Sequence, residues 1–518
     1  MLYLVEVTAW NPAVPGPVVL RFASSPGYVT RPDCTPANTV YEPRVISPGN
    51  FERHLYRSGA TGGGSEVAYG LIILNNADGG LDHLIGHGFD GRTLLIRRGE
   101  PDAAYPAGFP VLFRGTVEQA EFSWNRVTLR LRDRQAEIAE KPLQNNRYLG
   151  TNVAPGGVEG TAEDLKGQPK PRLYGRVSNI SPPCVNPWKA VYQVSDATGR
   201  PLAIDAVYDK GVRLTRSVAR ASLAELLAVV PAGGCWDWYR GAEGAFLRLG
   251  SPAAGRITCD AAEGAQASDR TAAGIARGIL TGPGGLTDAD LDAASLAALD
   301  AANPAEMGLW RGTEEDSVGR ALDEVLSGIG AYWVPDRLGT FRLGRLEAPQ
   351  GPPLERYEAW RILGPGIERL ISSDKGRGVP AWRITVRHSR NYTVQDENEL
   401  AGVAADRRAW LGSEYRSALA ENAALCIAHP LAGEITITSL LLSEQAAQAE
   451  AQRLLALRGV RRDLVRLKVH APEAAAIDLG AVVEVRLPRF GWDGGALFRV
   501  IGMVEDFERN RTELELWR

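Results

Sequence analysis

The chain has 518 residues, of which 44% are hydrophobic and 23% charged, with 57 glycines and 32 prolines. Because a single hydrophobic core stops growing at roughly 250–300 residues, we expect two to four domains, and the many turn-forming residues favour β structure. The net charge of −4 and the isoelectric point near 6.0 argue against a nucleic-acid-binding protein, which usually carries a basic stripe.

The cysteines and the N-terminal sequence exclude several classes of site and location. The five cysteines are odd in number, widely spaced and without a C-x-x-C pair, so free buried thiols are expected rather than disulfides or a metal site; they are Cys34, Cys184, Cys235, Cys259 and Cys426. The first residues alternate like a strand and lack the basic region and apolar core of a signal peptide. No apolar run approaches the roughly 18–20 residues that span a bilayer. We therefore expect a protein made and folded in a cytosol, with no membrane-spanning segment.

Residues 1–150 predict an N-terminal β-rich domain. Several runs alternate polar and apolar side chains, as strands of a half-buried sheet do. The expected strands are Tyr3–Thr8, Val18–Phe22, Glu66–Leu74, Thr93–Arg97, Val111–Val117 and Val127–Leu131. A domain edge is expected within residues 145–161, where glycine and asparagine cluster and the periodicity ends.

Two polar clusters in this domain do not match metal sites. Asn76, Asp78 and Asp82 are oxygen donors near a glycine, but an EF-hand aligned on that glycine has leucine and isoleucine where acidic ligands belong. His83 and His87 lie four residues apart without the glutamate of H-E-x-x-H, and glycines beside them argue against a helix. We expect turns at both places.

Residues 165–215 are expected to connect the N-terminal domain to the rest of the chain. Prolines punctuate the start of this segment, and proline does not fit a central helix or an interior strand. Two short strand-like pieces then flank Asp209, Lys210 and Gly211, which we interpret as the structural turn of a β-hairpin. Replacing Gly211 with valine should therefore damage folding or assembly.

Residues 216–351 predict a mixed α/β middle with two helix-plus-hairpin units. In the first unit, Ser217–Val229 has helical leucine spacing and is followed by two strand-like runs around a glycine-containing turn. In the second unit, Asp316–Leu326 precedes a similar pair of runs. We interpret the two units as an internal structural repeat, although this order can also recur by chance. Between them, residues 288–300 predict a helix with Thr287 as its N-cap.

Residues 352–518 predict a C-terminal β-rich domain with one long helix, which begins near Ser443 and runs through Leu457. The expected strands are residues 381–388, 434–440, 464–469, 481–485, 496–504 and 512–517. The loop at residues 486–492 carries Pro488, Phe490 and Trp492, which we interpret as a candidate partner-contact loop; packing within the same chain is the alternative.

The predicted fold class is therefore α+β: a β-rich, multidomain chain with β-barrel-like domains at both ends and mixed helix-plus-hairpin domains between them. Several motifs resemble tail-tip or baseplate hub proteins of long-tailed bacteriophages, including Mu-like phages with siphophage tails, and related prophage tail proteins. The motifs that carry the resemblance are KGQPKP at 166–171, IDAVYDKGV at 204–212, DLG at 478–480, LPRFG at 487–491 and FRVIG at 498–502.

The resemblance implies a structural virion protein in the tail tip or baseplate, assembled in the host cytoplasm. Such a hub is a homotrimer that joins the end of the tail tube to the spike or fibre assembly. Its implied partners are a distal tail or tube ring protein, the tape-measure protein and central spike or tail fibre proteins. Genomic DNA would pass through its channel without sequence-specific binding, and we expect acidic side chains to line that channel. No catalytic residue, cofactor or metal is implied.

Two other functions stay open from the sequence. A tail-associated enzyme that degrades the cell wall could use a pair of carboxylates, although the chain has no G-x-S-x-G, H-E-x-x-H or phosphate-loop motif. A tip protein that binds a receptor or glycan could use exposed aromatic residues, for which Trp492 is the candidate.

Overall fold

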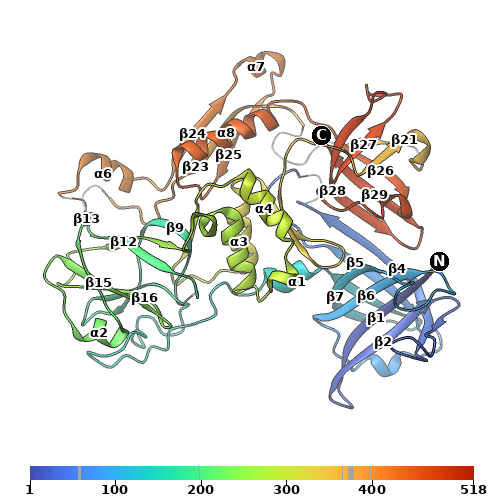
Figure 1. Cartoon of the computed structure of the whole chain (residues 1–518), viewed down its shortest axis with the longest axis horizontal. Helices are drawn as coiled ribbons and strands as arrows, with labels where there is room; N and C mark the ends of the chain where they lie inside the picture. Colours follow the sequence, from blue (N-terminus) through green and yellow to red (C-terminus); the bar gives the residue numbers. More distant parts are fainter. Residues whose placement is uncertain (57–59, 198, 365, 371–377, 397–399, 401) are drawn as a thin grey trace.

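The computed structural model describes residues 1–518 except 57–59, 198, 365, 371–377, 397–399 and 401. Strands make up 40% of the chain and helices 17%, which confirms the predicted β-rich α+β class. Two β domains lie at one end of the molecule, a β-sandwich lies at the other, and most of the helices lie between them (Figure 1).

The N-terminal domain is a closed seven-stranded barrel. Its strand order is β2-β1-β6-β7-β8-β5-β4, and β2 also pairs with β4, which closes the ring. Apolar side chains that alternate along the strands fill the interior, among them Val5, Phe113 and Leu129. The strands are β1 (Leu2–Asn11), β2 (Gly16–Ser24), β4 (Val40–His54), β5 (Tyr69–Asn75), β6 (Arg92–Gly99), β7 (Val111–Phe122) and β8 (Arg126–Arg132), and the short β3 (Tyr28–Val29) pairs with β4.

Strand β4 is the long strand that the sequence pattern does not predict. It contains Pro43 and Pro48, and prolines ordinarily argue against an interior strand because they cannot donate to the ladder. Pro48 lies in a register shift of the β4–β5 pairing, between Ser47 and Asn50. Pro43 lies in a register shift of the β2–β4 pairing, between Glu42 and Val45. Such irregularities bend a strand. The bent β4 can therefore pair with strands of two domains.

The C-terminal domain is barrel-like, as predicted. Its strand order is β21-β27-β28-β29-β26-β22. Both edge strands come from one continuous segment, residues 355–370, in which the N–H of Leu363 also donates to the carbonyl of Lys468. This segment therefore bridges the two edges of the sheet. The strands are β21 (Glu355–Glu358), β22 (Glu368–Leu370), β26 (Leu464–His470), β27 (Val482–Arg486), β28 (Ala496–Asp506) and β29 (Arg511–Trp517).

The expected connecting segment, residues 165–215, supplies strands of a β-sandwich. Two five-stranded sheets, β10-β11-β16-β15-β14 and β13-β12-β17-β9-β18, enclose a shared core that includes Ile204, Trp236 and Leu247. The strands are β9 (Arg172–Ile180), β10 (Cys184–Asn186), β11 (Val191–Ser195), β12 (Leu202–Asp209), β13 (Val212–Arg213), β14 (Thr215–Ala219), β15 (Cys235–Gly241), β16 (Gly244–Leu249), β17 (Ile257–Glu263) and β18 (Gly308–Arg311).

A helical layer with its own core connects the sandwich to the barrels. Helices α3, α4 and α5 pack with the β19–β20 hairpin and with the three-stranded sheet β24-β23-β25, one face of which is covered by α8. The strands are β19 (Ala331–Pro335), β20 (Phe341–Arg345), β23 (Ala381–His388), β24 (Arg416–Glu421) and β25 (Gly433–Thr438). The helices are α1 (Arg134–Ala139), α2 (Leu223–Ala228), α3 (Ala272–Thr281), α4 (Ala293–Ala302), α5 (Val318–Ser327), α6 (Ala405–Leu411), α7 (Ala424–Ala428) and α8 (Glu444–Arg458).

Both expected helix-plus-hairpin units are present, in different settings, but the first helix is shorter than predicted: residues 217–219 belong to β14, and α2 begins only at Leu223. Helix α2 precedes the β15–β16 hairpin inside the sandwich, whereas α5 precedes the β19–β20 hairpin inside the helical layer. Helix α8 begins after its N-cap Ser443, as predicted.

The predicted helix at 288–300 begins later than expected. Thr287 caps only a 3-10 turn, Asp288–Asp290, and Leu291 is extended and buried. The side chain of Asp292 then accepts from the backbone N–H groups of Ala294 and Ser295 and begins α4. The buried Leu291 therefore separates the 3-10 turn capped by Thr287 from the helix capped by Asp292.

The turn Asp209-Lys210-Gly211 closes a β-hairpin, as predicted. Asp209 pairs with Val212 across the turn, and φ is 48° at Lys210 and 78° at Gly211, as a two-residue type I′ turn requires. The turn is also a contact: a β-carbon added to Gly211 would lie 2.8 Å from Leu411 and 2.9 Å from Leu400. The turn therefore docks the sandwich onto the segment that carries α6.

We predict that Gly211→Val destabilises the protein more than Gly234→Val. Gly234 has a similar φ of 73° with no atom within 4 Å of an added β-carbon, so its substitution carries backbone strain alone. At Gly211 the added side chain also overpacks the Leu400–Leu411 contact, which costs roughly 1–3 kcal/mol more. Urea unfolding of the two variants measures the difference. Equal losses would show that the turn does not pack against α6.

Candidate functional site

The N-terminal barrel and the barrel-like C-terminal domain, which we together call the two barrels, share one hydrogen-bonded seam. The second half of β4, Asn50–His54, pairs antiparallel with Gly502–Asp506 of β28, and the N–H of Leu55 donates to the carbonyl of Ile501 at 2.8 Å. A β-carbon on Gly502 would lie only 2.3 Å from the His54 ring, so this position needs glycine. The N-terminal and C-terminal domains are therefore one continuous sheet, not two bodies on a linker.

Four charged side chains, two of them buried and two partly buried, form a cluster beside this seam, which we call the seam ion cluster: Arg53, Arg337, Asp478 and Glu505. The Arg53 guanidinium lies 2.9 Å from the Asp478 carboxylate and 3.6 Å from that of Glu505. Arg337 contacts the other Glu505 oxygen at 2.9 Å. The side chains of Arg53 and Glu505 are 3% and 4% exposed. Two cations and two anions balance one another here.

The cluster is stable only as a complete set. Removing an ion from water costs several kcal/mol unless a partner compensates. Burial by itself would raise the pKa of Asp478, but the charges of Arg53 and Arg337 outweigh it and lower that pKa from its ordinary value. Burial would likewise lower the pKa of Arg53, and Asp478 and Glu505 raise it instead. Both groups therefore stay charged at neutral pH.

Arg337 brings the helical layer into the same joint. It lies in the β19–β20 turn, and its guanidinium donates to the carbonyls of Ala475 at 2.7 Å and Ala474 at 3.1 Å in the C-terminal domain. Its own carbonyl accepts from the N–H of Arg114 on β7, at 2.8 Å. One hairpin turn thus contacts both barrels.

An apolar cluster completes the joint from the same three parts of the chain. Tyr56 follows β4, Tyr332 lies on β19 and Trp517 on β29, and all three are buried in one cluster. The two tyrosine rings meet edge to face at 6.0 Å, and the Tyr56 hydroxyl donates to the carbonyl of Gly330 at 3.1 Å. The relative positions of the barrels and the helical layer are therefore fixed by packing as well as by charge.

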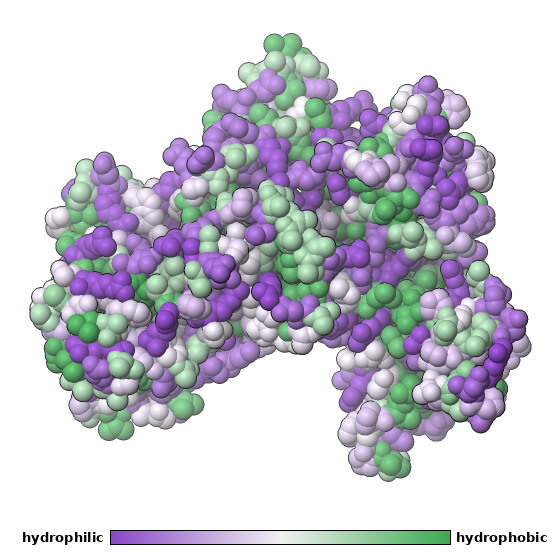
Figure 2. All heavy atoms as spheres, viewed as in Figure 1, coloured by the Kyte–Doolittle hydropathy of each residue, from purple (hydrophilic) through white to green (hydrophobic). Residues whose placement is uncertain are grey.

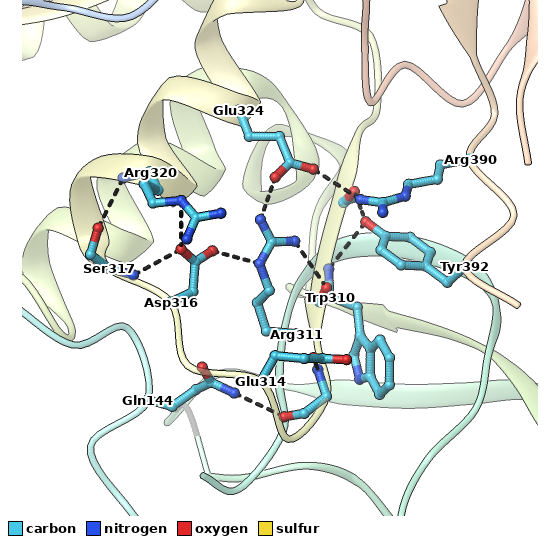
Figure 3. A network of polar contacts seen from close by, with 12 residues as sticks. Gln144, Trp310, Arg311, Glu314, Asp316, Ser317, Arg320, Glu324, Arg390 and Tyr392 are labelled. Carbon is cyan, nitrogen blue, oxygen red and sulfur yellow. Dashed lines mark hydrogen bonds and ion pairs between the residues drawn. The ribbon is translucent and has the colours of Figure 1, made fainter.

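A second polar network fixes the segment that follows β23 (Figure 3). Arg311 on β18 contacts Asp316 at 2.6 Å and also pairs with Glu324 on α5. Glu324 pairs in turn with Arg390 at 3.0 Å. The Tyr392 hydroxyl accepts from the N–H of Trp310 on β18, at 3.2 Å. This network attaches residues 390–392 to both the sandwich and the helical layer.

The candidate partner-contact loop divides into an exposed part and a buried part. Pro488 and Phe490 are exposed. Phe490 lies at the tip of the loop and is 48% exposed. Trp492 is only 2% exposed, with its ring 5.0 Å from that of Phe498 inside the C-terminal domain. The expectation that Trp492 is exposed is wrong, and the alternative of packing within the same chain holds for this residue. The loop folds back because the N–H of Leu487 donates to the carbonyl of Trp492 and the N–H of Trp492 donates to the carbonyl of Arg489, both at 3.1 Å.

The other candidate residues of the sequence lie elsewhere and do not join the seam. The turn at 209–211 belongs to the sandwich, and the rings of His83 and His87 meet edge to face at 6.3 Å near the barrel end. Among the described residues, no group of three or more His, Cys, Asp or Glu side chains could hold a metal ion. The five cysteines are unpaired, as expected, but of these only Cys259 is buried, and Cys426 is exposed. In the described part of the chain, no helix is both long and apolar enough to cross a membrane.

Comparison with known proteins finds similar solved structures. No family model and no curated protein matches the chain. The chain is similar to the tail protein from Neisseria meningitidis MC58, at 10% identity, with 100% of this chain and 96% of that chain covered and a TM-score of 0.39. It is also similar to a chain in the virion of a native gene transfer agent particle, at 14% identity, 73% and 91% coverage and a TM-score of 0.44. A third similar structure is a prophage tail protein from Listeria monocytogenes EGD-e, at 7% identity, 99% and 94% coverage and a TM-score of 0.41.

We predict that Asp478→Asn lowers the free energy of unfolding by about 3–5 kcal/mol at pH 7, because it leaves Arg53 buried with an incomplete set of partners. The pKa of Asp478 is lower in the folded protein than in the unfolded chain. Its contribution to stability is therefore present above the unfolded-state pKa of about 4 and is lost as the pH falls below that value. The variant should therefore lose less stability than the parent between pH 5 and pH 2. Urea unfolding across this range measures both effects, with the exposed Asp493→Asn as control. An Asp478→Asn variant as stable as the control would contradict the role given to the cluster.

We predict opposite results for the two aromatic residues of the partner-contact loop. Trp492→Ala should cost about 3–5 kcal/mol because it empties a buried site, whereas Phe490→Ala should change stability by less than about 1 kcal/mol. Denaturant unfolding followed by circular dichroism distinguishes them. A Trp492→Ala protein with unchanged stability would show that the indole is not part of the core.

Proposed function

We propose that the chain is a structural virion protein, the hub of a phage tail tip or baseplate. The observation that supports this most strongly is the pair of barrels in each chain, joined through β4 and β28 and held by the seam ion cluster. The proposed hub joins the end of the tail tube to the spike or fibre assembly and forms part of the channel for DNA ejection.

Two rigidly joined barrels in each chain suit a ring of mixed symmetry. A homotrimer carries six barrels, which can meet a hexameric ring protein on one side while the three chains meet a threefold spike on the other. Ring closure requires the same heterologous contact to repeat around the axis. A flexible linker between the barrels would not hold six positions in register, whereas a shared sheet with a buried ion cluster does.

The proposed partners follow from this place in the particle. They are a distal tail or tube ring protein, the tape-measure protein and the central spike or tail fibre proteins. Pro488 and Phe490 form an exposed corner suited to one of these contacts. DNA would cross the ring in transit, without sequence-specific binding. The proposed role is mechanical and assigns no catalytic residue, cofactor or metal. The protein would be assembled into the tail tip in the host cytoplasm.

We predict that the purified chain forms a particle with about three times the mass of one 55.8 kDa chain, because three copies are needed for six barrels. Light scattering coupled to size-exclusion chromatography measures this mass, and addition to hub-deficient tails measures incorporation. The Asp478→Asn variant should incorporate poorly, whereas Asp493→Asn should behave like the parent. A monodisperse monomer that never joins a tail would overturn the proposal.

A further inference from the structure

A cavity of about 980 Å³ lies between the three-stranded sheet β24-β23-β25 and the C-terminal domain. Ile435 and Ile437 of β25 and Leu454 of α8 line one side, and Leu464 and Trp517 of the C-terminal domain line the other. The sheet and this domain lie side by side (Figure 1), and the surface dips between them and is largely hydrophilic there (Figure 2). Ligand pockets ordinarily measure about 300–1,000 Å³, so this cavity has room for several side chains of a partner.

The cavity follows the free edge of β25. Successive side chains of a strand point to opposite faces of a sheet, yet four successive residues, 435–438, line the cavity. A space that touches all four therefore runs along the edge of the strand and not over one face. In the described part of the chain this edge is unpaired, because β25 is the last strand of its sheet and pairs with β23 alone.

The register of β25 identifies the backbone groups at this edge. The N–H of Ser439 donates to the carbonyl of Arg387 on β23, at 2.8 Å. Backbone groups alternate between the two edges of a strand, so those of Ile437 also face β23, whereas those of Thr436 and Glu434 face the free edge. A further strand would bond to these outward N–H and C=O groups.

The sequence of β25 does nothing to discourage pairing at its edge. Exposed edge strands are commonly protected by lysine, proline or a bulge. The strand Gly433–Thr438 contains neither lysine nor proline, and after Glu434 it alternates isoleucine with threonine, which are residues that favour strands. Its one register shift against β23 lies at its start. The edge is therefore suited to accept a strand.

The wall of the cavity carries more positive than negative charge. Its arginines are Arg369, Arg453, Arg458, Arg461 and Arg462, and its one acidic residue among those that the structure describes is Asp463. Asp463 pairs with Arg369, and Glu450 pairs with Arg453 at 2.6 Å. These two arginines are therefore neutralised within the chain.

Arg461 and Arg462 have no such partner. In the part of the chain that the structure describes, no carboxylate forms an ion pair with either of them. Arg461 is exposed, and the Arg462 guanidinium lies 5.0 Å from the centre of the Trp517 ring. Burial and the charges of Arg458 and Arg518 lower the pKa of Arg462. An Asp or Glu brought by a partner would balance this charge.

We infer that the free edge of β25 binds an extended segment of another protein as a fourth strand of the sheet, and that the segment carries apolar side chains for the cavity and an Asp or Glu for Arg461 and Arg462. The backbone edge selects an extended chain, the isoleucines and Trp517 select apolar side chains, and the arginines select the acid. In strand addition, main-chain hydrogen bonds supply affinity, and pockets for alternate side chains supply specificity. This binding mode does not depend on the chain being a tail hub.

The first test asks whether the edge is free in the purified chain. Hydrogen exchange resolved to single amides should be fast at Thr436, whose N–H faces the edge, and slow at Ile437, whose N–H faces β23. Equal protection of the two amides would show that another part of the chain or a second copy covers the edge, and would overturn the inference.

The second test identifies what the edge binds. A display library of random twelve-residue peptides, selected on the parent protein, should enrich sequences that alternate apolar with polar residues and include Asp or Glu. An enriched peptide should bind the Thr436→Pro protein at least tenfold more weakly in fluorescence anisotropy, because proline removes the outward N–H. The control Thr436→Val keeps that N–H and should bind like the parent. Both variants should keep the melting temperature of the parent. Equal binding by the Thr436→Pro protein, or no enrichment of such sequences, would overturn the inference.

The third test addresses charge. Arg461→Glu should weaken binding of the same peptide by about three- to tenfold, because an exposed attraction becomes a repulsion, and added salt should weaken binding to the parent. Arg509→Glu, at an exposed arginine of the β28–β29 turn, is the control and should bind like the parent. An Arg461→Glu protein that binds as tightly as this control would overturn the acidic character given to the segment. Trimer mass and incorporation into tails test the hub proposal separately.

Discussion

The geometry of the molecule depends on a buried arginine, Arg53, which lies between the carboxylates of Asp478 and Glu505 at the seam of the two barrels. A buried guanidinium is tolerated only with its partners in place, and those partners belong to the far end of the chain. Arg337 extends the same charge balance to the helical layer. The barrels cannot separate without exposing or unpairing these charges, so the seam holds three parts of the chain in one orientation.

The sequence predicts much of the fold and little of this joint. Alternating polarity along β1, β5 and β8 identifies the N-terminal barrel, and Ser443 correctly marks the start of α8. Strand β4 is missed because its prolines normally end strands, and register shifts in its pairing with β5 and with β2 accommodate them. Trp492 is misplaced because a loop position says nothing about whether the loop folds back. The charges of the ion cluster resemble those of any solvated strand, since their partners are set by a pairing that no local pattern reveals.

The remaining contacts extend the joint towards the sandwich. The polar network around Arg311 and Glu324 attaches residues 390–392 to β18 and α5, and the Gly211 turn packs on Leu400 and Leu411. The sandwich is thus held by side-chain contacts as well as by its covalent connections. On the proposal made above, force applied at one end of the tail would pass through paired strands, ion pairs and packed side chains without a hinge.

The most direct test of the central claim is a reconstruction of the tail end by electron cryomicroscopy at a resolution that separates β-strands. The account predicts six barrels around the axis, each chain occupying two adjacent positions joined through β4 and β28. A reconstruction in which each chain occupies one position, or in which the two barrels of a chain are separated from one another, would contradict it.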